Sequence, residues 1–156
     1  MTVPEYVANQ TERVADSMAH FLTVMPADRL KWKPELPGAA STRSALEQVS
    51  ECVGVNRLVA KVLRGEVVTG SYEETEFADG DEAQKLIQES AAELTAAIRA
   101  MSEADLTRVY AHPRAQISGE NLIMMCYRNM AYHNGQINLI QMLYGDAEFH
   151  LPPKWR

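Results

Sequence analysis

The sequence predicts an all-α fold, a four-helix bundle joined by long connecting loops. Three observations support this fold class. Apolar residues recur at alternating spacings of three and four in four separate stretches, which is the repeat of an amphipathic helix. No stretch has the sustained two-residue alternation of a half-buried strand. Segments rich in proline, glycine or acidic residues separate the four stretches, and proline and glycine interrupt helices.

Length and charge narrow the possible functions. The 156 residues suit one domain, residues 1–156, with a core of its own. A net charge of −6 argues against nucleic acid and an acidic membrane surface as partners, because binding to either needs clustered Lys and Arg. No apolar run is long enough to cross a membrane, and the first residues lack the basic start and apolar core of a secretory signal. We therefore expect a cytoplasmic protein.

The first helix is expected to run from Pro4 to about Met25. Thr2 can cap it, and proline suits the first turn of a helix. Residues 26–40 contain three prolines and a glycine, so they are expected to form a connection. Its large apolar residues are expected to lie across the end of the bundle: Leu30, Trp32 and Leu36.

The second helix is expected to begin at Ser41 or Ser44 and to end near Arg64. Ser44 followed by Glu47 has the spacing of a capping box, which favours the second start but does not exclude the first. Most of its inward positions are apolar. Gln48 is a polar interruption among them.

Residues 66–80 have the length to cross the end of a bundle rather than to make a tight turn. Asp81 can then cap a third helix that runs to about Met101. Residues 102–117 are expected to contain one short helical turn, followed by an extended piece that Pro113 interrupts.

The last helix, residues 118–144, carries the feature that most needs explaining. Ser118 can cap its start and Gly145 can end it. Its seam has polar residues in the middle, where a bundle helix normally has Leu, Ile or Val. The seam consists of Leu122, Cys126, Asn129, His133, Gln136, Ile140 and Leu143. Burying three polar side chains is costly unless they bond one another, a partner helix, water or a metal, so this patch is the candidate site.

Two cysteines, Cys52 and Cys126, fall inside the second and last helices beside this patch. We expect them to be small buried residues with reduced thiols. As soft ligands, they are also candidates to replace a missing metal ligand near the site.

Two stretches resemble the DinB-like (damage-inducible B) superfamily. Its last helix carries a His-x-x-x-His pair followed by x-Gly-Gln, and Asn129, His133, Gly135 and Gln136 fall on those four positions. Its second helix often begins with Trp-Ser and has a histidine seven residues after the serine. Here Ala40 and Ser41 stand at the first two positions, and Gln48 stands at the histidine position.

The resemblance implies a four-helix bundle, often a dimer, with three histidines that bind a divalent metal, commonly zinc or nickel. Members of the family include thiol-dependent transferases and isomerases. In this sequence the three ligand positions read Gln48, Asn129 and His133. Amides replace imidazole poorly as zinc or nickel ligands, so we expect no tightly bound metal unless the site still functions with His133 and other ligands. Gln48, Asn129, His133 and Gln136 could instead form a hydrogen-bonded network, and Glu51 is expected to be a surface acid.

Three functions remain open. The favoured one is a protein that binds a small molecule, or serves as a structural or regulatory dimer, at a site that has lost its metal. The alternatives are a divalent-metal-dependent hydrolase or thiol transferase with an altered ligand set, and a helical interaction module without a pocket. Whether the chain is an enzyme is therefore undecided. We expect a homodimer in which apolar residues beside the seam meet a second copy: Met124, Tyr127 and Leu139.

Overall fold

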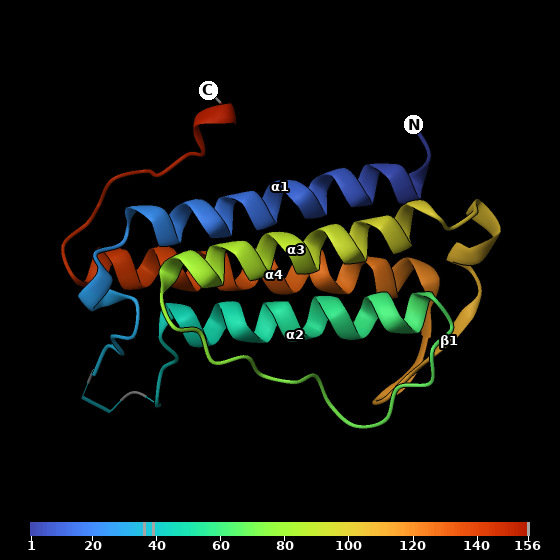
Figure 1. The fold of residues 1–156 in the computed structure, drawn as a ribbon, viewed down its shortest axis with the longest axis horizontal. Coiled ribbons are helices and arrows are strands. Elements are labelled where there is room, and N and C mark those ends of the chain that lie inside the picture. The colour runs from blue at the N-terminus through green and yellow to red at the C-terminus, as the bar shows by residue number, and fades with distance from the viewer. Residues whose placement is uncertain (36, 39, 156) are drawn as a thin grey trace.

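The computed structural model describes residues 1–35, 37–38 and 40–155, and Leu36 of the expected end cover lies outside them. Four long helices form a bundle, and a short β-hairpin and three 3-10 turns accompany them in the described part of the chain (Figure 1). The predicted four-helix bundle is confirmed. The helices are α1 (Val3–Val24), α2 (Ala45–Leu63), α3 (Gly80–Arg99) and α4 (Gly119–Leu143), and the strands are β1 (Val109–His112) and β2 (Ala115–Ser118). The turns are η1 (Ala27–Arg29), η2 (Glu103–Leu106) and η3 (Pro153–Trp155).

The helix starts are set by local capping. Thr2 caps α1, and Ser44, rather than Ser41, caps α2 in a capping box. The prediction for α3 was wrong by two residues, because Asp79 and not Asp81 caps it. The Asp79 side chain accepts a hydrogen bond from the backbone N–H of Glu82 at 2.9 Å, which leaves Asp81 inside the first turn.

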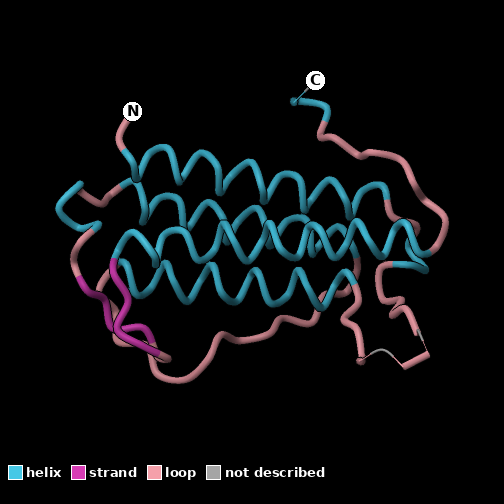
Figure 2. The backbone as a smooth tube through the Cα atoms, turned by 180° about the vertical axis from the view of Figure 1, so that it is seen from behind, coloured by secondary structure: helices cyan, strands magenta, loops and turns pink. Residues whose placement is uncertain are grey.

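The order of helix directions explains the long second connection. α2 and α3 run in the same direction, while α1 and α4 run the opposite way (Figure 1). Residues 64–79 therefore return along the length of the bundle beside α2 instead of crossing its end, as Figure 2 also shows from behind. The expected route across the end was wrong, because loop length alone does not distinguish the two routes.

A glycine allows this returning segment to lie against α2. A Cβ atom at Gly54 would lie 2.4 Å from the carbonyl oxygen of Glu73 and 2.9 Å from a ring carbon of Tyr72. Nearby, the backbone N–H of Thr75 donates to Ser50 Oγ at 2.7 Å. Residues 72–75 are thus fixed on the outer side of α2, next to the candidate site.

The core lies between the four helices, and Trp32 covers one end of it. The Trp32 ring packs edge-on against Tyr144 with centroids 6.3 Å apart, and Arg29 lies over both rings. Leu30 is buried in the core beside the start of α3, so the expected end cover is present for both Leu30 and Trp32. No helix in the described residues is long and apolar enough to span a membrane.

The buried side of α4 differs from the expected seam. Asn129 and Gln136 are half-buried, and Leu143 is exposed. Residues one position away are buried in their place: Ile123, Met130 and Ile137. The reason is that an α-helix has 3.6 residues per turn, so a seam with a seven-residue repeat drifts around a straight helix. The drift leaves the two amides at the edge of α4 instead of in its buried centre.

Candidate functional site

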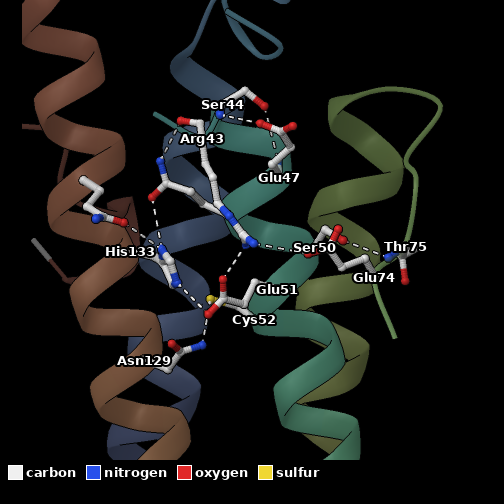
Figure 3. A network of polar contacts seen from close by, with 12 residues as sticks. Arg43, Ser44, Glu47, Ser50, Glu51, Cys52, Glu74, Thr75, Asn129 and His133 are labelled. Atoms are coloured by element: carbon white, nitrogen blue, oxygen red, sulfur yellow. Dashed lines mark hydrogen bonds and ion pairs between the residues drawn. The ribbon is translucent and has the colours of Figure 1, made fainter. Parts of the chain in front are cut away.

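His133 is the centre of a polar network between α2 and α4 (Figure 3). Its side chain is buried, with 5% of its surface exposed. Nδ1 lies 3.1 Å from Gln48 Oε1 and 2.8 Å from Gln136 Oε1, and Nε2 lies 3.3 Å from Glu51 Oε1. All three neighbours are acceptor oxygens, so a ring nitrogen that carries a hydrogen can donate to the oxygen that it faces.

Gln48 is oriented by the start of its own helix. Its Nε2 donates to the backbone carbonyl of Arg43 at 3.2 Å, just before the helix begins, and this turns Oε1 toward His133. The capping box of Ser44 holds the same stretch in place. The structure thus brings Gln48, His133 and Gln136 together, although they come from two helices.

Asn129 lies near these residues but bonds elsewhere. Its Nδ2 donates to Cys52 Sγ at 3.7 Å rather than to the imidazole. Cys126 is fully buried, and its thiol approaches the carbonyl of Val55 at 3.9 Å. Burial in apolar surroundings raises the pKa of both thiols, so neither is readily available as a thiolate ligand.

Glu51 is part of the site, so its interpretation as a surface acid was wrong. Its side chain is 21% exposed, and while Oε1 faces His133, Oε2 accepts a short hydrogen bond from Arg43. Arg43 also reaches Glu74 Oε1 at 3.3 Å. Burial opposes the Arg43 charge, but the hydrogen bond with Tyr72 and the Glu51 carboxylate outweigh it and raise the pKa of Arg43.

The sequence does contain a signal for the position of Glu51. Gln48 and Glu51 are three residues apart, and such residues are neighbours on a helix surface. Once Gln48 is placed beside His133, Glu51 must lie on the adjoining strip of α2. Arg43 has no comparable signal, because it precedes the helix and its direction depends on the connection.

A cavity of about 600 Å³ opens beside this network. Its polar wall includes Gln48, Glu51, Asn129, His133 and Gln136. Its outer edge is apolar and exposed: Tyr132 is 64% exposed, Leu139 54% and Leu143 42%. A concave site of this size with a few converging polar groups is typical of small-molecule binding.

The residues present do not fit a three-histidine metal site. No group of three or more His, Cys, Asp and Glu side chains that could hold a metal ion occurs among residues 1–35, 37–38 and 40–155. His133 and Glu51 supply two good donor groups, whereas a stable zinc site normally takes three or four from the protein. In addition, side chains of the same chain already contact both imidazole nitrogens.

Comparisons with known proteins agree with the fold. The sequence model of the DinB superfamily matches residues 10–137. A DinB-like protein from Bacillus subtilis has a similar structure, with a TM-score of 0.70 and 18% identity over 94% of this chain and 96% of that chain. YfiT from Bacillus subtilis, described as "a probable metal-dependent hydrolase with an unusual four-helix bundle topology", gives a TM-score of 0.71 and 16% identity over 93% and 90% of the two chains.

A third similar structure is a DinB-like protein from Bacillus cereus, with a TM-score of 0.63 and 12% identity over 85% of this chain and 87% of that chain. At these identities the structural likeness establishes the fold alone. No curated protein sequence matches this chain.

Proposed function

This chain belongs to the DinB superfamily, and we propose that it binds a small polar molecule beside His133 without a tightly held zinc or nickel ion. The observation that carries the proposal is the set of contacts around His133. Gln48 and Gln136 occupy Nδ1, and Glu51 faces Nε2, so the imidazole is held by hydrogen bonds where a metal-binding histidine would present a free nitrogen. The adjoining cavity of about 600 Å³ supports a small-molecule ligand.

Metal binding is the decisive measurement. We expect elemental analysis of protein purified without a histidine tag to find less than stoichiometric zinc or nickel, and titration with either ion to give weak binding. A variant carrying both Gln48→His and Asn129→His is the positive control, because it restores the family's three histidine positions. Stoichiometric metal in the parent protein that is lost in His133→Ala would overturn the proposal.

Ligand binding can be tested with a panel of small polar metabolites and thermal unfolding. We expect a compound that binds beside His133 to raise the Tm of the parent protein and to have a smaller effect on Gln136→Ala, because Gln136 lines the cavity. Gln116→Ala, on the exposed side of the hairpin, is the matched control. Equal responses of the two variants would place the ligand elsewhere.

A second candidate function is a divalent-metal-dependent hydrolase or thiol transferase with an altered ligand set. The Glu51 carboxylate favours it, because an oxygen ligand lies 3.3 Å from His133 Nε2 and could share a cation with the imidazole. The same metal titration separates the two candidates. Under this second function, Glu51→Gln would abolish binding of the added ion.

We also propose that the protein acts as a homodimer in the cytoplasm. Met124 and Tyr127 of the expected contact face are half-buried and pack partly against the chain's own core, so they offer less surface to a second copy than Leu139. Leu139 is exposed, and Met142 and Leu143 extend the apolar surface beside the cavity. Sedimentation equilibrium is expected to give twice the monomer mass for the parent protein, and a mass closer to that of one monomer for Leu139→Glu. A parent protein that is monomeric at high concentration would contradict the dimer.

A further inference from the structure

A second cavity, of about 580 Å³, lies along the same face of the bundle toward the β-hairpin. It is formed by α2, the returning segment, the hairpin and α4. Glu51, Asn129 and Tyr132 line both cavities and therefore form the wall between them. The second cavity makes no use of His133, Gln48 or Gln136, so its argument does not depend on the function proposed above.

The inner surface of this cavity is apolar. Val55 and Leu58 come from α2, Ile117 from the hairpin and Met125 from α4. Leu58 is buried, and the other three are partly buried against the core. Tyr72 of the returning segment adds an aromatic wall, which Gly54 makes possible by letting that segment approach α2. The cavity can therefore hold an apolar group of several carbons.

The charged groups around this apolar surface are two arginines and one glutamate. Arg114 and Arg128 line the cavity and are exposed, and neither forms an ion pair with an acid in the described part of the chain. Glu51 is the one acid among the described lining residues, and Arg43 already holds its carboxylate. The chain carries a net charge of −6, so the positive charge of two unpaired arginines at one cavity differs in sign from the charge of the chain as a whole.

His112 adds a neutral donor to the same cavity. Burial, with a contribution from the nearby Arg114 charge, lowers the pKa of His112, so its ring is uncharged at neutral pH. The backbone N–H of Arg114 lies 3.2 Å from His112 Nδ1 and donates to it, which leaves the ring hydrogen on Nε2. The cavity thus offers two guanidinium groups and an N–H donor, which is the pattern that an anionic oxygen group needs.

We propose that this cavity binds a small amphipathic carboxylate, with its alkyl or aryl body on the apolar surface and its carboxylate at Arg114 and Arg128. The volume lies within the roughly 300–1,000 Å³ range of small-ligand sites. Arginine binds a carboxylate with two parallel hydrogen bonds, so these side chains recognise the head group while the apolar surface accepts bodies of varied shape. The chemical class is therefore a monocarboxylate with an apolar body.

Octanoate is a suitable probe, with octanamide as its uncharged counterpart. Calorimetry is expected to detect octanoate binding with a Kd below about 1 mM and markedly weaker octanamide binding. Arg128→Met and Arg114→Met are each expected to weaken octanoate binding about tenfold and to leave octanamide binding unchanged. Arg13→Met is the matched control, because it removes the same charge from an exposed position on α1 that lines neither cavity.

The proposal would be overturned by no octanoate binding by the folded parent protein, by equal binding by a variant that carries both Arg114→Met and Arg128→Met, or by an equal loss in Arg13→Met. A loss in Gln136→Ala but not in the arginine variants would also overturn it, because octanoate would then occupy the His133 cavity. Finding stoichiometric metal in the parent protein would overturn the proposed function but would leave these octanoate results unaffected, so the two proposals can fail separately. Thermal unfolding of each variant verifies that it is folded.

Discussion

Replacing His133 by alanine is expected to lower the free energy of unfolding by about 1.5–4 kcal/mol. Gln48 Oε1 is buried and would lose its partner, which costs about 1–3 kcal/mol. The edge-to-face contact with Tyr132, with ring centroids 5.4 Å apart, contributes about 0.5–1 kcal/mol more. Gln136 and Glu51 are partly exposed and can turn to water. For a chain of 156 residues, this corresponds to a fall in Tm of about 3–16 °C.

A double-mutant cycle isolates the interaction between the two buried residues. Gln48→Met removes the amide while keeping a side chain of similar length, so Gln48→Met with His133→Ala leaves no unpaired oxygen between them. We expect the double variant to be at least about 1 kcal/mol more stable than the sum of the single effects predicts. Urea unfolding at one fixed protein concentration measures each value, because a dimer would make stability concentration-dependent. Additivity within about 0.5 kcal/mol would refute the reasoning.

Three other measurements test separate features. Gly54→Ala is expected to destabilise the fold by about 1–3 kcal/mol despite the better helix propensity of alanine, because its Cβ would overlap the returning segment; unchanged urea unfolding would contradict this close approach. Arg99→Met is expected to cost about 0.5–1 kcal/mol at pH 7 after solvent screening. The hydrogen bond from Arg99 lowers the pKa of Glu12 in the folded protein. The stabilisation by the pair is therefore present above the ordinary pKa of 4.5 and is lost as the pH falls through the lowered pKa of the folded state. If the stability difference between Arg99→Met and the parent did not change with pH, the Arg99–Glu12 pair could not be its source. Cys52 and Cys126 are expected to react with an aromatic disulfide reagent only on unfolding, since burial raises the pKa of both thiols, and rapid labelling of the folded protein would show that they are accessible.

Helix positions were predictable because they depend on residues close together in the sequence. Thr2 and Ser44 cap the first two helices through contacts three residues away. Asp79 and Asp81 are chemically equivalent as caps, and each has a Glu or Gln three residues later, so the local sequence does not choose between them.

The site was predictable only in part, for a similar reason. The spacing of Gln48 and His133 along their helices, together with the family resemblance, indicated that they meet. The rotation of each helix about its axis decides the remaining contacts. Asn129 was expected beside the imidazole but is turned toward Cys52, and Glu51 was expected outside but faces His133. A rotation of a few tens of degrees separates these alternatives, and a seven-residue pattern does not resolve it.

Gly54 also gives a way to compare relatives of this chain by their sequences. A glycine inside a helix costs about 0.5–1 kcal/mol relative to alanine, so a bundle has little reason to keep one without a close neighbour. Here the neighbour is the segment that carries Tyr72, which walls the second cavity. A relative with a large side chain at the equivalent position must route this segment further from the helix. Such a relative is expected to have a wider and more open second cavity, so the residue at this one position predicts the width of that cavity.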